Sequence, residues 1–269
     1  MIDLHSHILP GIDDGAANMA ATLDMARLAV ADGVRIMACT PHMMPPLYPN
    51  HSGIIQPAVE AAQRAIDESG IDLRLIAGAE VHLAPDLLKQ LRSGYAQTFG
   101  STSYFLLEPS HTITPPQFER FVKAIIDAGY RPIIAHPERL TWIEQHYALI
   151  CAVDEAGAAM QLTAGALLGQ FGSRPRYWAE RMLSEGRVDI IASDAHDARR
   201  RLPGLSAGMA AAAVIVGADS ARAMVLDNPA AVLRDQPLPA KKRAKVKDFA
   251  PKETAMVKLM KMWSGQMRT

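Results

Sequence analysis

Short apolar segments alternate with longer amphipathic segments along most of the chain. The apolar segments have the length of strands and are bounded by turn residues, which predicts strands at residues 1–5, 34–40, 73–79, 104–108, 131–136, 159–163 and 188–193. The intervening segments have helical periodicity, which predicts helices at residues 19–32, 57–69, 85–92, 116–128, 140–156 and 177–185. Seven strand–helix units in a row indicate a parallel sheet covered by helices.

A closed α/β barrel of the TIM-barrel type fits this repeat better than an open, doubly wound sheet. An open sheet would normally have a glycine-rich phosphate-binding turn after its first strand. Gly11 and Gly15 follow the first predicted strand, but they lack the spacing of that turn. We therefore expect residues 1–234 to form one barrel domain.

Charge divides the chain at about residue 235. The 269 residues contain 28 Lys and Arg and 28 Asp and Glu, so the formal net charge is zero. Nine of the basic residues but only three of the acidic ones lie in residues 235–269, which form a basic extension. Residues 235–248 are predicted to be an exposed linker or arm. Residues 252–263 could form a short helix that docks on the barrel, or that binds a partner or a membrane surface.

The composition favours a cytoplasmic protein. The amino-terminal segment has neither the basic nor the apolar region of a secretory signal, and no apolar run approaches the length of a membrane span. The two cysteines, Cys39 and Cys151, lie in hydrophobic surroundings and are predicted to be buried free thiols. The acidic charge of residues 1–234 argues against a nucleic-acid partner.

Histidines and carboxylates stand at the ends of six of the seven predicted strands. His5 and His7 lie two apart at the end of the first strand, so both imidazoles can face one ion. Each such residue alone has a structural explanation, for example a helix cap or a hydrogen-bonded buried histidine. In α/β barrels, however, the carboxyl ends of the strands form one face. The full set at this face would be His5, His7, Asp14, His42, Glu80, Glu108, His136, Asp194 and His196.

So many anions and imidazoles around one mouth indicate bound cations. Nitrogen and oxygen ligands without thiolate suit Mn²⁺, Fe²⁺, Co²⁺ or Zn²⁺. Nine ligands are too many for one tetrahedral ion and could hold two or three. Such clusters activate water and bind both oxygens of a phosphoryl transfer.

Arginines lie just beyond two of these strand ends. Arg139 follows His136 by three residues, and Arg199, Arg200 and Arg201 follow His196. A guanidinium group can bind phosphate oxygens in a bidentate way, which suits an anionic substrate. We expect at least one member of the triplet to be a solvated loop residue.

Seven motifs identify a family resemblance over about residues 1–230. HSHILPGIDDG, TPHMMPPLYPN, AGAEVHL, LLEPS, IIAHPERL, LTAGALLGQFG and IIASDAHD resemble, in order and spacing, the CpsB/CapC/YwqE type of bacterial tyrosine-protein phosphatase. That type belongs to the polymerase-and-histidinol-phosphatase (PHP) superfamily. The resemblance implies a distorted (β/α)7 barrel, a three-metal centre that favours manganese, and a tyrosine autokinase of capsule or exopolysaccharide assembly as the substrate.

The resemblance also implies roles for individual residues. One metal would be held by His5, His7, Glu80 and Asp194; a second would share Glu80 and use Glu108 and His136; a third would use Asp14, His42 and His196. Arg139 and Arg201 match family arginines that hold the phosphate. In LLEPS, Pro109 and Ser110 stand where bulkier apolar residues are expected, which predicts a reshaped substrate groove.

Other functions fit the same residues less well. A histidinol-phosphate phosphatase or a phosphodiesterase of the same superfamily would use the same metal ligands. A metal-binding barrel that serves only as a kinase partner, with or without self-association, would not need all nine positions. An amidohydrolase would place a lysine at a strand end, and none of these strands ends in lysine.

Overall fold

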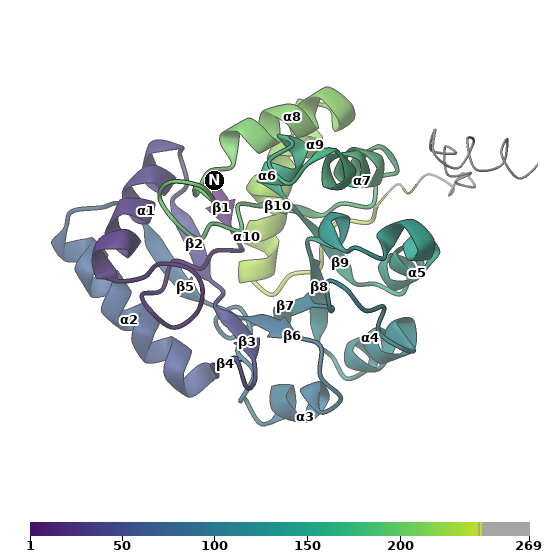
Figure 1. Cartoon of the computed structure of the whole chain (residues 1–269), viewed down its shortest axis with the longest axis horizontal. Helices are drawn as coiled ribbons and strands as arrows, with labels where there is room; N and C mark the ends of the chain where they lie inside the picture. Colours follow the sequence, from purple (N-terminus) through teal and green to yellow (C-terminus); the bar gives the residue numbers. More distant parts are fainter. Residues whose placement is uncertain (242, 244–269) are drawn as a thin grey trace, which may run out of the picture.

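The computed structural model describes residues 1–241 and 243 as a ring of strands surrounded by helices (Figure 1). The strands are β1 (Ile2–Asp3), β2 (Ile36–Cys39), β3 (His42–Met44), β4 (Tyr48–Pro49), β5 (Arg74–Ala77), β6 (Glu80–His82), β7 (Tyr104–Glu108), β8 (Arg131–Ala135), β9 (Ala159–Thr163) and β10 (Ile190–Ala192). The helices are α1 (Met19–Ala31), α2 (Ser52–Glu68), α3 (Leu87–Arg92), α4 (Phe118–Asp127), η1 (Pro137–Arg139), α5 (Ile143–Glu155), α6 (Ala164–Leu167), α7 (Ser173–Ser184), α8 (Ser206–Val216), α9 (Ala218–Val225) and α10 (Asp227–Leu233).

The strands form two sheets that together make the ring. The first has the order β1-β2-β5, the second β10-β9-β8-β7-β6-β3-β4, and every pair is parallel except β3 with β4. The strands predicted at residues 34–40 and 73–79 are β2 and β5, and each is followed by a bend and a short strand that was not predicted, β3 and β6. Gly78 lies at the second bend, and a side chain there would meet the Phe99 ring at 3.0 Å, so the bend requires glycine. After the bends, β3 and β6 continue in the second sheet.

The ring closes where the last strand meets the first. Ser6 and Ala195 form a parallel bridge, His7 N donates to Ala195 O (2.8 Å), and Asp194 N donates to His5 O (2.9 Å). The expected TIM-barrel-like α/β architecture is therefore confirmed in a distorted form, with two sheets in place of one continuous sheet. The closure also brings the ends of β1 and β10 together, where four of the predicted ligands lie.

The buried apolar residues form two hydrophobic cores. The larger core lies between the strands and the surrounding helices. The smaller core fills the interior of the ring with side chains near the starts of the strands, such as Ile2, Tyr104 and Ile190. Val232 of α10 belongs to this interior core, so α10 covers the amino end of the ring. The polar residues, in contrast, lie at the carboxyl ends of the strands.

Some predicted helix boundaries are wrong, and the short helices η1 and α6 and the helices α8 to α10 were not predicted. Helix α2 begins at Ser52 and includes Pro57, because the His51 side chain caps it by accepting from Gly53 N and because Ile55 is buried. Helix α7 begins at Ser173, ahead of the predicted residue 177. Helices α8 to α10 follow the last predicted strand, and of these α8 is apolar nearly throughout and shows no amphipathic period.

The start of the basic extension is anchored to the barrel. Asp235 Oδ1 accepts a hydrogen bond from Ser103 Oγ (2.6 Å), and Arg243 Nε lies 2.6 Å from the buried Asp154 Oδ2. The segment between them is largely exposed, as predicted, but it is not a free arm. The helix predicted at residues 252–263 lies outside the described residues.

Two further expectations can be compared with the structure. Cys39 and Cys151 are both buried free thiols, as predicted, and burial raises the pKa of the Cys151 thiol to about 11. Within residues 1–241 and 243, none of the helices is long and apolar enough to cross a membrane.

Candidate metal centre

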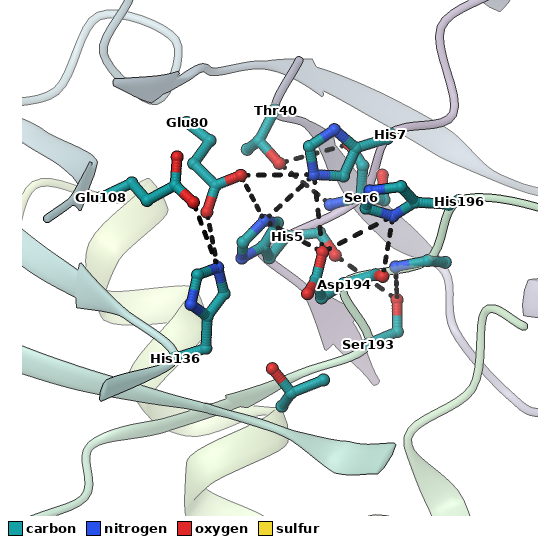
Figure 2. Close-up of polar contacts among 12 residues, drawn as sticks. His5, Ser6, His7, Thr40, Glu80, Glu108, His136, Ser193, Asp194 and His196 are labelled. Carbon is teal, nitrogen blue, oxygen red and sulfur yellow. Dashed lines mark hydrogen bonds and ion pairs between the residues drawn. The ribbon is translucent and has the colours of Figure 1, made fainter. Parts of the chain in front are cut away.

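The structure brings all nine predicted ligands together at the carboxyl ends of the strands. Figure 2 shows seven of them, which converge from β6, β7 and the segments after β1, β8 and β10. Most are buried, and His5 and His7 have no exposed surface. His42 and Asp14 are the more exposed members, with side chains 15% and 45% accessible. We refer to the nine residues below as the metal centre.

Atoms of four of these residues lie at the spacing expected of ligands that share one ion. His5 Nε2 lies 3.3 Å from His7 Nε2, 3.3 Å from Glu80 Oε2 and 3.4 Å from Asp194 Oδ1. His7 Nε2 lies 3.4 Å from the same Glu80 oxygen and 3.5 Å from the same Asp194 oxygen. A tetrahedral ion with ligands at about 2.1 Å needs ligand atoms about 3.4 Å apart. Five ligand–ligand distances therefore fit one ion.

The hydrogen bonds of three histidines leave Nε2 available for a metal. His5 Nδ1 donates to Gln161 Oε1 (3.0 Å), and His7 Nδ1 donates to Asp13 Oδ2 (2.7 Å). His196 Nδ1 donates to the Asp194 carbonyl oxygen (3.1 Å). When the other ring nitrogen is a donor, Nε2 carries the lone pair that a cation needs. Both the protonation state and the spacing of these Nε2 atoms therefore suit metal binding.

A second group is formed by Glu80, Glu108, His42 and His136. His136 Nε2 lies 2.8 Å from Glu80 Oε1 and 4.0 Å from Glu108 Oε1. His42 Nδ1 lies 3.1 Å from Glu80 Oε2, yet neither atom makes a hydrogen bond, because the two atoms are not aligned for one. Two buried polar atoms that lie close together without a hydrogen bond have the arrangement expected of two ligands of one cation.

A third group lies at the edge of the centre. Asp14 Oδ1 is 3.4 Å from His196 Nε2 and 3.5 Å from His42 Nε2, and His7 also lies within reach of this group. Burial opposes ionisation of Asp14, but the hydrogen bond with His196 and the nearby imidazoles outweigh it and lower the pKa of Asp14 to about 2. The carboxylate is thus ionised and available to a cation.

Asp13 was missed by the sequence reasoning, although it neighbours Asp14. Its Oδ2 accepts from His7 Nδ1 and from His42 N (3.1 Å), and its Oδ1 accepts from Gly15 N (3.0 Å). Gly15 allows this loop to approach β1, because an added Cβ would lie only 1.9 Å from His7 O. Asp13 therefore orients two candidate ligands at once. The motif GIDDG contained it, but two adjacent aspartates do not reveal which one faces inward.

Three more residues surround the centre without having been predicted. Gln161 lies in β9, which was the one predicted strand without a candidate ligand. His111 Nε2 is 3.2 Å from Glu108 Oε1, and His82 Nδ1 is 3.8 Å from Glu108 Oε2. Periodicity offered a signal only for His82, which lies two residues after Glu80 and hence on the same side of the strand.

Two candidate ligands adopt a backbone conformation that side chains other than glycine rarely take. His136 has φ +32° and Asp194 has φ +53°, both in the left-handed region. Such residues cost about 1–3 kcal/mol each and persist where the surrounding structure enforces them. Here the conformation turns both side chains toward the centre at the point where their strands end.

The two predicted arginines lie beside the centre and share one partner. Arg139 Nη1 and Arg201 Nη2 both contact Asp194 Oδ2, the latter at 2.5 Å, while Asp194 Oδ1 faces the histidines. The Phe171 ring lies below both guanidinium groups, 4.5 Å from the first and 5.9 Å from the second. Arg199 and Arg200 are exposed, which confirms the expected solvated members of the triplet.

Comparisons with known proteins agree with this site. The family model for capsular polysaccharide synthesis proteins of the CpsB/CapC type matches residues 1–234. The tyrosine-protein phosphatase YwqE of Bacillus subtilis is 33% identical over 201 residues, which cover 75% of this chain and 79% of that protein. The tyrosine-protein phosphatase CpsB of Streptococcus agalactiae serotype V is 24% identical over 244 residues, covering 87% of this chain and 99% of that protein.

A solved structure extends the likeness to the fold. Crystal structures of YwqE from Bacillus subtilis and CpsB from Streptococcus pneumoniae describe metal-dependent tyrosine phosphatases; the matched chain has a TM-score of 0.88 and 30% identity, and covers 92% of this chain and all of its own. A lactonase from Listeria monocytogenes, at 13% identity and a TM-score of 0.52 over 86% of this chain and 94% of its own, shares the fold alone.

Proposed function

The chain belongs to the CpsB/CapC family of capsular polysaccharide synthesis proteins, and on this premise we propose that it is a metal-dependent protein-tyrosine phosphatase. The observation that carries the proposal is the set of four ligand atoms from His5, His7, Glu80 and Asp194, spaced for one ion beside two arginines. Cations and arginines on one face suit a phosphate dianion.

We assign two or three divalent ions to the metal centre. His5, His7, Glu80 and Asp194 would hold the first, and Glu80, Glu108 and His136 the second. Asp14, His42 and His196 would hold the third. The buried Glu80 Oε2, which makes no hydrogen bond, supports its role as a shared ligand. Manganese is the metal that the family resemblance favours, and the nitrogen and oxygen donors also suit Fe²⁺, Co²⁺ and Zn²⁺.

The protein residues would position the substrate and balance its charge. Bound divalent ions lower the pKa of water and polarise phosphoryl oxygens. Arg139 and Arg201 would bind the phosphate, since Arg201 Nε has no hydrogen-bond partner. Asp194 would keep both arginines next to the metals through its second oxygen, and Phe171 would hold the guanidinium planes. Cys39 is not a nucleophile here, because burial raises the pKa of its thiol far above neutrality.

The substrate we propose is a phosphotyrosine protein, and we infer that it is a tyrosine autokinase that controls capsule or exopolysaccharide assembly. The phenolate leaving group has a pKa of about 10, which makes the P–O bond easier to break than that of an alkyl phosphate. The relatives named as tyrosine-protein phosphatases support the phosphotyrosine assignment, and the family description supports the link to capsule synthesis.

A metal and substrate panel tests the proposal. Chelator-treated protein is reloaded with Mn²⁺, Co²⁺, Zn²⁺ or Mg²⁺ and assayed with a phosphotyrosyl peptide, a phosphoseryl peptide, histidinol phosphate and a phosphodiester. We expect metal-dependent hydrolysis of the phosphotyrosyl peptide ahead of the other three. Faster hydrolysis of histidinol phosphate would contradict the substrate assignment, and full activity in chelator would contradict the metal mechanism.

A further inference from the structure

A second concavity lies beside the metal centre, between the end of β6, the loop that follows β7, and α4. Its volume is about 700 Å³, which is within the range of small ligand sites. Its lining is mostly apolar and includes three prolines in addition to aliphatic and aromatic side chains. Those that matter for ligand binding are His82, Ser110, Ile113 and Arg120. We call this concavity the flanking groove.

The flanking groove adjoins the metal centre. His82 lines the groove, and its Nδ1 lies 3.8 Å from Oε2 of the candidate ligand Glu108. Ser110 also lines it and stands two residues after Glu108. A ligand whose phosphate reached the metals could therefore extend directly into the groove.

The wall of the groove is held in place by hydrogen bonds. Trp142 Nε1 donates to Ser110 O (2.8 Å), and Thr141 donates to His111 O through both its backbone N (2.9 Å) and its Oγ1 (2.8 Å). These bonds tie the loop between β7 and α4 to the start of α5. The groove is thus preformed, which reduces the entropic cost of binding a chain in it.

The groove combines exposed apolar surface with one cation. The Ile113 side chain lines the groove and is 68% exposed, so it offers apolar surface to a ligand. Arg120 lines the same groove, and among the described residues its side chain is hydrogen-bonded only to Gln117 Oε1 (3.3 Å). Among residues 1–241 and 243, no carboxylate lies within ion-pairing distance of Arg120. An apolar side chain and a nearby carboxylate would satisfy both features.

We propose that the flanking groove binds the polypeptide next to the phosphotyrosine and selects an apolar residue accompanied by an acidic one. This inference rests on the proposed phosphatase function and adds sequence preference to it. A small phosphate ester would be held by the metals and arginines alone and would gain nothing from the groove. A polypeptide substrate is the occupant that fits. Its phosphate would lie in the metal centre, and the chain on either side of the phosphotyrosine would have to extend out of that centre.

Two peptides and three variants test the proposal. The first peptide carries leucine and glutamate on both sides of phosphotyrosine, and the second carries glycine and lysine at the same positions. The variants are Ile113→Ser, Arg120→Glu and the control Val214→Ser, in which an 89% exposed side chain of α8 is removed elsewhere. Each protein is assayed with Mn²⁺ on both peptides and on p-nitrophenyl phosphate, and binding of the first peptide is measured in chelator by fluorescence anisotropy.

We expect Ile113→Ser and Arg120→Glu each to lower kcat/KM for the leucine–glutamate peptide about tenfold, with weaker binding to match. Turnover of p-nitrophenyl phosphate should stay within about twofold, since the reacting groups are untouched. Arg120→Glu should also reverse the preference and favour the lysine peptide. Val214→Ser should behave as the wild type.

Equal losses on the peptide and on p-nitrophenyl phosphate would overturn the groove proposal, and so would unchanged peptide kinetics. A change in self-association with unchanged peptide kinetics would assign the groove to a second copy of the chain instead. If wild-type protein hydrolyses none of the phosphate substrates with any metal, the phosphatase proposal itself fails. That result differs from phosphatase activity that is unaffected by the groove variants, which would contradict the groove proposal alone.

Discussion

Two clusters of buried charge lie at opposite ends of the barrel. The metal centre lies at the carboxyl ends of the strands, and the second cluster, which we call the basal cluster, lies at their amino ends. In the basal cluster the buried Asp154 contacts Arg187 Nη1 (3.0 Å), Lys241 Nζ and Arg243 Nε (2.6 Å). Lys241 also contacts Asp189 Oδ2 (2.5 Å), so cations and anions alternate throughout.

The two clusters differ in whether all of their buried polar atoms have a hydrogen-bond partner. Among the described residues, no buried side-chain nitrogen or oxygen of the basal cluster lacks a hydrogen-bond partner. In the metal centre, Glu80 Oε2, His42 Nδ1 and His136 Nδ1 all lack one. Buried charge alone therefore does not distinguish a functional site from a structural one. Unpartnered polar atoms that converge on one point do, because only a ligand can satisfy them.

The strongest test of this comparison removes one shared charge from the metal centre. We expect Glu80→Gln to lower kcat/KM for a phosphotyrosyl peptide by about 10³-fold, because a neutral amide cannot hold two cations. Metal content by atomic emission should fall as well, while the far-UV circular dichroism stays unchanged. The control Glu60→Gln alters an exposed carboxylate of α2. Wild-type activity in Glu80→Gln would refute the shared ligand.

The matching change in the basal cluster should affect stability and leave catalysis alone. Asp154→Asn removes a fully buried counter-charge of Arg187, which is 1% exposed and keeps the more exposed Glu155 and Glu185 as partners. It also removes a partner of Lys241 and Arg243. We expect the free energy of unfolding to fall by about 3–5 kcal/mol in urea titrations, with kcat/KM of the folded protein unchanged. Asp24→Asn, in an exposed pair with Arg27, should cost less than about 1 kcal/mol. Equal effects of the two substitutions would show that the basal cluster is not structural.

A smaller effect should follow from the residue that orients the ligands. Asp13→Asn keeps the shape of the side chain but weakens its hold on His7 Nδ1. We expect metal affinity to fall about 10–100-fold, as for other partners of metal-bound histidines. Titration of the metal-free protein with Mn²⁺ by calorimetry measures it. Asp67→Asn in α2 is the control, and an unchanged affinity in Asp13→Asn would assign Asp13 to the loop alone.

The smallest effect should come from the ring below the arginines. Phe171→Leu removes the contact with Arg139 and Arg201 while keeping an apolar side chain. Cation–π contacts contribute about 0.5–2 kcal/mol, so we expect kcat/KM to fall about tenfold, mainly through KM. Metal affinity should not change. A loss of metal affinity would mean that Phe171 supports the metal centre rather than the arginines.

Much of the metal centre could be predicted because strand ends are visible in the sequence. Apolar runs that stop at a histidine or carboxylate indicate both the element and the face on which the residue lies. Asp13 and Gln161 could not be predicted in this way. Their roles depend on how a loop folds back over β1 and on which residues of β9 face His5, and both are tertiary properties.

The helices that were missed or misplaced have identifiable local causes. Helix α8 has the sequence SAGMAAAAVIV, which is apolar on all sides and gives no period to detect. Helix α2 was placed too late because Pro57 resembles a helix start, whereas the tertiary contacts of Ile55 extend the helix ahead of it. The basic residues after residue 240 suggested a solvated arm, since the sequence does not show that Asp154 is buried and in need of counter-charges.

Helix α10 determines the route by which molecules enter and leave. Because it covers the amino end of the ring and the interior is filled with side chains, the described residues leave the carboxyl ends of the strands as the open end of the barrel. A dephosphorylated tyrosine and the inorganic phosphate must therefore depart through the same opening that admits the next substrate. The deeper product, phosphate, would leave last. Because phosphate released last occupies the site that the next substrate must enter, phosphate would be a competitive inhibitor of the proposed reaction.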